Sequence, residues 1–181
     1  MSYITTISGK HFDPVAPVED LIDIRDIAHS LSLICRGNGH VHHFYSVAQH
    51  SLCCAKEAQA RGYGNFVELA CLMHDASEAY LSDVTRPVKK DLTYYLEVEE
   101  RLQGLIWRHY LGRELTGEEK CLVSRVDDDV MSQEFRCNMA EVINEDYRNL
   151  QRVFDCAYEV PVLVEQEFLE RFAVLMDKLT V

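Results

Sequence analysis

Two histidines and two aspartates stand in this chain at positions from which they could converge on one divalent cation. His74 and Asp75 are adjacent within residues 68–84, and His50 and Asp127 belong to segments before and after it. Small and apolar residues surround each of the four. A buried carboxylate costs free energy unless it is paired or bound to a cation. Two imidazoles and two carboxylates suit Mn, Fe, Co, Ni or Zn better than Ca, so the pattern predicts a divalent-metal site.

A third acidic group belongs to the same pattern. Glu78 follows Asp75 by three residues, and side chains three or four apart share a helix face. A helix over residues 68–84 would therefore gather His74, Asp75 and Glu78 into one polar patch. A single histidine on an apolar face is more often a hydrogen-bonded core residue than a ligand. It is the combination of these residues that favours a site.

The stretch "VDDDV" offers three consecutive aspartates, of which one faces the expected core. Asp127 has valines and a methionine within one helical turn, whereas Asp128 and Asp129 have Ser, Arg and Gln as neighbours. Residues one turn apart lie on the same side of a helix. The periodicity therefore predicts that Asp127 points inward and that Asp128 and Asp129 point outward.

The segments that must position these residues carry helical periodicity, and strand signals are nearly absent. Ser46 and Gly62 bracket the second predicted helix, and Thr116 with Glu119 forms a capping box before the fifth. The sequence predicts an all-α bundle with one domain over residues 1–181. The predicted helices are residues 20–36, 46–62, 68–84, 91–112, 117–139 and 161–179, with a weaker one around 143–154.

Composition narrows the class of protein. No apolar run reaches the roughly 20 residues that span a bilayer, and the N-terminal residues lack a secretory pattern, so a cytoplasmic protein without a membrane partner is expected. The net charge of −12 disfavours binding to nucleic acid polymers but not to a small anion. Seven cysteines without a C-x-x-C pair disfavour a disulfide framework and a thiol-rich zinc site.

Three segments carry a family resemblance. In order they are "SVAQHS", "CLMHDASEAYLSDVTRPVKK" and "EEKCLVSRVDDDV", and together they resemble the H…HD…D signature of the HD-domain metal-dependent phosphohydrolases over residues 24–135. The match is closest to the branch of bacterial 5′-deoxynucleotidases and phage-type dATP triphosphohydrolases. It implies an HD-type helical domain that holds one divalent ion (Mn, Co, Zn, Fe, Ni or Mg), with His50, His74, Asp75 and Asp127 as ligands.

The resemblance also implies roles beyond the metal. Glu78 matches the position that activates or positions the attacking water, Arg36 and Lys89 match contacts to substrate phosphate, and Asp83 matches an acid of a "GD-x-P-x-P" region. That region reads "SDVTRP" here, without the glycine and the first proline. Gly37 stands where the 5′-deoxynucleotidase pattern has Trp.

The function implied is hydrolysis of (deoxy)nucleoside phosphates by a metal-activated water. A 5′-nucleotidase and a triphosphohydrolase of deoxynucleoside triphosphates, including dATP-like substrates, both fit. The alternative is a non-catalytic metal or nucleotide sensor on the same fold; the presence of Glu78 favours the enzyme. Cyclic-dinucleotide phosphodiesterases of this superfamily carry further downstream histidines, whereas here only His109 follows Asp75.

Two further clusters have more ordinary interpretations. Three histidines in "GHVHHFY" are expected in a loop facing solvent or phosphate, with a second metal site as the less favoured alternative: His40, His42 and His43. Three aromatic residues of the fourth predicted helix suit core or subunit contacts, which makes a homo-oligomer an expectation: Tyr94, Tyr95 and Trp107.

Overall fold

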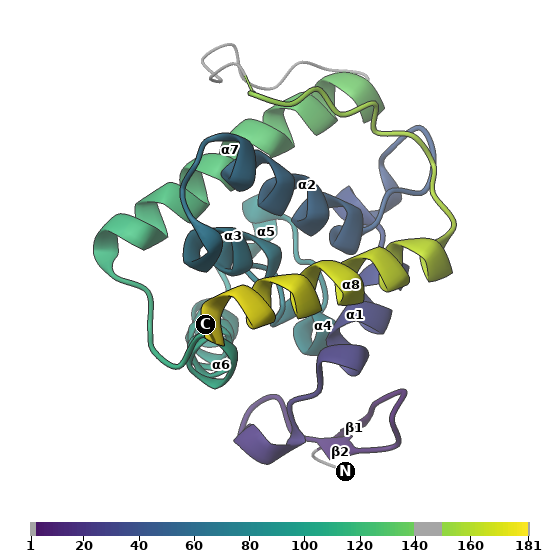
Figure 1. Ribbon diagram of the computed structural model, residues 1–181. Coiled ribbons are helices and arrows are strands. Elements are labelled where there is room, and N and C mark those ends of the chain that lie inside the picture. Colours follow the sequence, from purple (N-terminus) through teal and green to yellow (C-terminus); the bar gives the residue numbers. More distant parts are fainter. Residues whose placement is uncertain (1–2, 140–149, 181) are drawn as a thin grey trace.

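The computed structural model describes residues 3–139 and 150–180, and it shows a helical bundle (Figure 1). Within these ranges the chain forms eight α-helices: α1 (Ile24–Leu33), α2 (Val47–Ala60), α3 (Asn65–Leu72), α4 (Glu78–Leu81), α5 (Arg86–Lys89), α6 (Thr93–Leu111), α7 (Gly117–Asn138) and α8 (Pro161–Thr180). Two short 3₁₀ turns accompany them, η1 (Glu19–Leu21) and η2 (Arg36–Gly39). The predicted all-α class is confirmed.

The opening segment, expected to be irregular, contains a minimal hairpin. Strand β1 (Ile4–Thr5) pairs antiparallel with β2 (His11–Phe12), with Ile4 opposite Phe12. The Phe12 side chain is fully buried and stacks on Tyr80, with ring centroids 4.0 Å apart. This contact attaches the hairpin to the helical core through α4.

The bundle has two buried apolar clusters that share α2 and α3. In the first, α8 lies across α1, α2 and α3 (Figure 1), and its Phe168 packs among buried residues that include Leu31 and Leu69. In the second, α7 packs on the other side of α2 and α3 through Val126 and Cys71. Because α2 and α3 are held from two sides, side chains that project from them toward α7 have fixed positions.

The helix starts follow from local capping. The Ser46 hydroxyl accepts a hydrogen bond from the Gln49 amide, and the side-chain oxygen of Gln49 accepts one from the Ser46 amide. Helix α2 therefore begins with a capping box. Thr116 and Glu119 make the same exchange at the start of α7. Both predicted caps are confirmed.

The helix expected over residues 20–36 is shorter than predicted. Helix α1 ends at Leu33, and the next residues are extended and tied to the start of α2. Cys35 forms a bridge with Ser46, and the Arg36 amide donates to the Tyr45 carbonyl at 2.9 Å. These bonds to a neighbouring segment replace the helical ones, and Arg36 therefore begins the turn η2 instead of ending a helix.

The expectation of one helix over residues 68–84 is wrong. Helix α3 ends at Leu72 and α4 begins at Glu78, so His74 and Asp75 lie in the connection between two helices. The connection contains hydrogen bonds between residues three apart, such as the Glu78 amide to the Asp75 carbonyl at 3.0 Å. It has neither glycine nor proline, and no local breaker signals the interruption.

The break is stabilised by a side chain from another helix. Gln103 of α6, 6% exposed, donates from Nε2 to the Met73 carbonyl at 2.7 Å. Its Oε1 accepts from the Ser77 amide at 3.0 Å. A buried backbone group without a partner is costly, and in a continuous helix the Ser77 amide would donate to the Met73 carbonyl. The Gln103 side chain replaces this one hydrogen bond by bonding to both groups.

One further predicted helix and the prediction about membrane spans can be compared with the described residues. Of the weak helix around 143–154, residues 143–149 lie outside the described ranges and residues 150–154 are not helical. Across the two described ranges, no helix has both the length and the hydrophobicity needed to cross a bilayer.

Replacing Gln103 with Leu tests the role of this bridge. The Gln103→Leu variant keeps a side chain of similar size but leaves the Ser77 amide without its acceptor and the Met73 carbonyl with the Ala76 amide as its partner, which costs about 1 to 3 kcal/mol of unfolding free energy. Urea unfolding measures the change. Glu97→Leu on the exposed face of α6 is the matched control and is expected to stay within about 0.5 kcal/mol of the wild type. Equal stability of the two variants would contradict this account of the helix break.

Candidate metal centre

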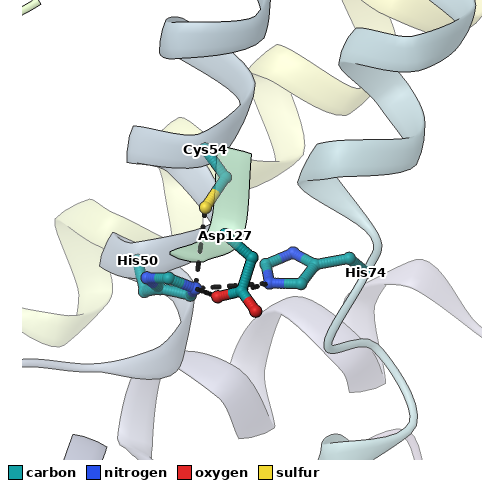
Figure 2. Close-up of side chains that lie close together, drawn as sticks. All are labelled: His50, Cys54, His74 and Asp127. Carbon is teal, nitrogen blue, oxygen red and sulfur yellow. Dashed lines mark hydrogen bonds and ion pairs between the residues drawn. The ribbon is translucent and has the colours of Figure 1, made fainter. Parts of the chain in front are cut away.

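Four potential ligand atoms converge between α2, α7 and the α3–α4 connection. They belong to His50, Cys54, His74 and Asp127, and they all lie within 4.8 Å of one another. Figure 2 shows His50 and Cys54 projecting from one helix and Asp127 and His74 approaching from two other segments. Three segments far apart in the sequence thus supply one cluster.

The centre of the cluster is the space between two imidazole nitrogens. His50 Nε2 lies 3.2 Å from His74 Nε2 and 3.0 Å from Asp127 Oδ1. Asp127 Oδ1 is 3.7 Å from His74 Nε2. The His50 side chain is fully buried.

Hydrogen bonds behind the rings fix which nitrogen faces the centre. His50 Nδ1 lies 3.0 Å from both carboxylate oxygens of Glu134, and His74 Nδ1 lies 2.7 Å from the Cys71 carbonyl. A carboxylate and a carbonyl can only accept, so each Nδ1 carries a proton. Both Nε2 atoms are then free to turn a lone pair toward the same point. Metal-binding histidines show this arrangement because the partner on the far nitrogen fixes the tautomer and the ring orientation.

A second carboxylate completes the set predicted from sequence. Asp75 Oδ2 lies 3.3 Å from His74 Nε2 and 3.8 Å from His50 Nε2. The structure thus brings together all four predicted ligands, although the helix expected to carry two of them is absent.

Cys54 is a fifth candidate that the sequence pattern did not mark as a ligand. Its Sγ lies 3.6 Å from His50 Nε2, and burial raises the pKa of the thiol to about 11. Without a cation the group is therefore a neutral thiol at pH 7, and coordination would require its deprotonation. The carboxylate of Asp127 needs no such step, because hydrogen bonds to His50 and His74 hold its pKa well below the usual value despite burial. The two imidazoles and two carboxylates form a mixed N/O set suited to a transition-metal dication, with Cys54 available to a softer metal.

Opposing effects set the proton affinity of the two imidazoles. Burial would lower the pKa of His50, but nearby groups, including Glu134 and Asp127, outweigh it and raise the pKa well above its usual value. Burial would also lower the pKa of His74, but Asp75 and Asp127 outweigh this effect and raise the pKa above its usual value. The acidic surroundings thus stabilise positive charge between the rings, whether a proton or a metal ion supplies it.

Glu78 lies beside this cluster in a buried position. Its side chain is 5% exposed, and within the described part of the chain its Oε2 atom has no hydrogen-bond partner. Lys89 Nζ lies 3.8 Å from the other oxygen. Burial raises the pKa of the carboxyl well above its usual range, and the charges of Asp75 and Asp83 add to the effect.

The predicted phosphate contacts lie around one cavity of about 610 Å³ that opens on the cluster. Arg36 Nη1 is 3.5 Å from Asp75 Oδ2, and its Nη2 is 3.8 Å from Glu134 Oε2. Side chains from several segments line the cavity near the cluster, among them Arg36, Asp75, Glu78, Asp83, Lys89 and Asp127. All the predicted substrate residues therefore border the same space as Asp75 and Asp127 of the cluster.

Glu134 and Arg86 are further polar residues of the site that the sequence interpretation missed. Glu134 follows Asp127 by seven residues, two turns along the same face of α7, and this spacing could have revealed it. Arg86 Nη2 donates to Asp127 Oδ2 at 3.0 Å. No periodicity marks Arg86, because the short helix α5 that carries it sits at the cluster through tertiary packing.

The expectation that Asp129 points outward is wrong. Asp129 is 5% exposed, and its Oδ2 accepts from Arg61 Nη2 at 2.8 Å. Arg61 also donates to the buried Glu57 at 2.7 Å. A guanidinium from the end of α2 compensates the desolvation of the carboxylate, and periodicity within α7 carries no information about that partner.

The histidine-rich loop gives no second metal cluster among the described residues. His43 Nε2 lies 2.6 Å from the Cys156 carbonyl, and the His42 amide donates to the Asn138 carbonyl at 2.9 Å. These contacts tie the loop to the end of α7 and to the segment before α8.

Comparisons with known proteins give relatives without a stated activity. No family model matches the chain. It is 44% identical over 110 residues to the uncharacterized protein YfdR of Escherichia coli K12, which covers 61% of this chain and 59% of the relative. It is 40% identical over 106 residues to an uncharacterized protein of Rhodobacter capsulatus, covering 55% and 54%. The chain thus spans less than two thirds of the length of these relatives. Its function is therefore inferred from the geometry of the site.

Removing the carboxylate behind His50 is expected to weaken metal binding. Glu134→Ala leaves the Nδ1 proton of His50 without its acceptor, and loss of such a partner costs about 10- to 100-fold in metal affinity. Titration with Mn²⁺ or Co²⁺ by calorimetry measures the effect. Glu165→Ala on α8 removes the carboxylate that contacts His29, outside the cluster, and is expected to bind like the wild type. Unchanged affinity in Glu134→Ala would contradict the orienting role.

Metal binding is also expected to release protons. The raised pKa of His50 and His74 keeps the imidazoles protonated to higher pH than an ordinary histidine, and a cation must displace these protons. Affinity should therefore rise as pH increases through the raised pKa and fall on acidification. Calorimetry at one pH in buffers of different ionisation enthalpy counts the released protons. A count of zero near pH 7 would show that the rings are already neutral.

Proposed function

We propose that this protein is a metal-dependent phosphohydrolase that acts on (deoxy)nucleoside phosphates. The observation that carries the proposal is the pair of buried imidazole Nε2 atoms 3.2 Å apart, next to a buried glutamate oxygen without a partner. The two Nε2 atoms face each other and the carboxylates of Asp75 and Asp127, so this space favours a positive charge, which a divalent cation would supply. The resemblance to the HD-domain phosphohydrolases supports the same conclusion independently.

The donor atoms present fit a divalent cation. His50 and His74 offer neutral nitrogens whose tautomers are fixed from behind, and Asp75 and Asp127 offer carboxylate oxygens within 3.8 Å of His50 Nε2. These four residues would hold the ion, with Mn, Co, Zn, Fe, Ni and Mg as the candidates. A bound dication supplies a water of lowered pKa and polarises a phosphoryl oxygen.

Glu78 is the residue we assign to the attacking water. It follows Asp75 by one turn and borders the same cavity, and its Oε2 has no hydrogen-bond partner among the described residues. A raised pKa makes an ionised carboxylate a stronger base, closer to the value that general-base catalysis favours near neutral pH. Lys89, 3.8 Å from Oε1, stabilises the ionised form. Glu78 would orient the water and accept its proton.

Three cations from two segments, the turn η2 and the helix α5, suit the phosphate group. Arg36, Arg86 and Lys89 border the cavity, and the two arginines contact Asp75 and Asp127, the carboxylates of the ligand set. Carboxylates that bind a cation attract a guanidinium less strongly, which leaves arginine N–H groups available to phosphate oxygens. A cavity of about 610 Å³ lies in the range of small-molecule sites, so a nucleotide is a substrate of suitable size.

The reaction is tested by a product assay on a panel of nucleotides. Deoxy- and ribonucleoside 5′-mono- and triphosphates are incubated with Mn²⁺, Co²⁺ or Mg²⁺, and orthophosphate and tripolyphosphate are quantified separately. We expect turnover that a chelator abolishes. Release of orthophosphate from monophosphates would establish a 5′-nucleotidase, and release of tripolyphosphate a triphosphohydrolase. Binding of metal and nucleotide without any turnover would replace the enzyme by the sensor.

Replacing Glu78 separates catalysis from metal binding. Glu78→Gln keeps the shape of the side chain but cannot accept a proton, so turnover is expected to fall by about 10²- to 10⁴-fold. Metal content, measured by atomic emission, should stay at the wild-type level because Glu78 is not one of the assigned ligands. Glu97→Gln on the exposed face of α6 serves as the control and should retain full activity. Wild-type turnover in Glu78→Gln would contradict the assignment of Glu78 to the attacking water.

A further inference from the structure

An amide side chain that the proposed chemistry does not use lies in the same cavity. Asn138, the last residue of α7, is 2% exposed and lines the 610 Å³ space. Within the part of the chain that the structure describes, neither its Oδ1 nor its Nδ2 atom has a hydrogen-bond partner. A buried amide with both functions unpaired is costly, and such a group in a cavity indicates a ligand that supplies the missing partners.

The walls next to Asn138 are apolar. The side chains that line this part of the cavity include Val41, Met131, Phe135 and Met139. Gly37 approaches them closely, since a Cβ atom there would lie 2.9 Å from Met139 Cε. An apolar slot closed by one donor–acceptor pair suits a flat heteroaromatic ring, whose faces are apolar and whose edge carries polar atoms.

The position of Asn138 relative to the cluster fits the two ends of one nucleotide. Asp127, Met131, Phe135 and Asn138 succeed one another at intervals of three or four residues, so they occupy one face of α7. The eleven residues from Asp127 to Asn138 span about 16 Å along the helix axis. This length leaves room for a sugar and a base beyond a phosphate that is held at the metal ligands.

A second cavity, of about 660 Å³, also reaches His74, Asp75 and Asp127. It extends between α6 and α7 along Trp107 and several charged side chains, and it is bordered by neither Glu78 nor Arg36. The cavity that contains Asn138 includes both. A substrate phosphate in reach of Glu78 and Arg36 therefore places the rest of the molecule toward Asn138.

We propose that Asn138 binds the nucleobase of the substrate through two hydrogen bonds. Nδ2 donates to an acceptor on the base edge, and Oδ1 accepts from an adjacent N–H, while the ring packs against Met131, Phe135 and Met139. The inference rests on the proposed function for the phosphate end of the ligand. It adds that the base is recognised by its polar edge, and it assigns that recognition to the end of α7.

Changing the amide to a carboxylate alters this recognition in a defined way. Asparagine offers one donor and one acceptor, whereas ionised aspartate offers acceptors only. Adenine, cytosine and thymine present no two adjacent donors, but guanine presents N1–H beside its N2 amino group. Asn138→Asp is therefore expected to weaken binding of adenine, cytosine and thymine nucleotides by about 10- to 100-fold and to shift relative preference toward guanine.

Equilibrium dialysis with Mn²⁺ measures binding of the four deoxynucleoside 5′-monophosphates and of base-free 2-deoxyribose 5-phosphate, in a Glu78→Gln background that prevents turnover. Binding of the base-free phosphate should be the same with and without the Asn138→Asp change. Gln59→Glu, an amide-to-acid change on an exposed residue at the end of α2, is the matched control and should leave all five affinities unchanged.

Asn138→Leu is the second variant, and circular dichroism verifies the folding of both. It should lower the affinity for every base-containing ligand about 10- to 100-fold and spare the base-free phosphate. Unchanged affinities across the panel in the folded variants would overturn the inference, as would an equal loss for the base-free phosphate. Failure of the proposed function shows separately, as absence of turnover by the wild type.

Discussion

Two imidazole Nε2 atoms lie 3.2 Å apart at the junction of three segments, and each ring is fixed from behind by an acceptor that takes its Nδ1 proton. The rest of the site follows from this constraint. Two lone pairs directed at one point repel each other unless a positive charge lies between them, and Asp75 and Asp127 surround that point with negative charge. The bundle thus holds a polar arrangement that is stable only with a cation or protons. The helices that carry it are fixed by apolar clusters on both sides of α2 and α3.

The interruption between α3 and α4 is the second structural requirement. In a continuous helix, His74 and Glu78 would lie one above the other along a single face. The break gives His74 a bond from Nδ1 to the Cys71 carbonyl and turns its Nε2 toward His50, while Glu78 starts a new helix at the cavity. Gln103 offsets the free-energy cost of the break by hydrogen bonding to the Met73 carbonyl and the Ser77 amide. A residue of α6 outside the cluster thereby shapes the candidate metal centre.

Basic residues outside the set of candidate ligands balance the negative charge of the site. The chain carries a net charge of −12, and the cluster concentrates several carboxylates in a buried place. Arg36 after α1 brings positive charge to Asp75, and Lys89 on α5 brings positive charge to Glu78. The same cations suit an anionic substrate, so the groups that balance the carboxylates of the site are those that would bind phosphate. At the far end of the cavity, the unpaired amide of Asn138 provides polarity without charge, which suits a nucleobase better than a phosphate.

The sequence by itself determined the helical class, the cap at Ser46, the capping box at Thr116 and the four candidate ligand residues, because hydrophobic periodicity and caps are local properties of the chain. It also indicated that Asp127 lies on the inner face of α7, and Glu134 could have been found on the same face two turns on. Only the tertiary structure decided where the helix around His74 breaks, that Asp129 is buried against Arg61, and that Cys54 and Arg86 reach the cluster. In each of these cases the stabilising partner comes from a distant segment. A local pattern contains no information about such a partner, since the energy of a buried polar group depends on what the fold places opposite it.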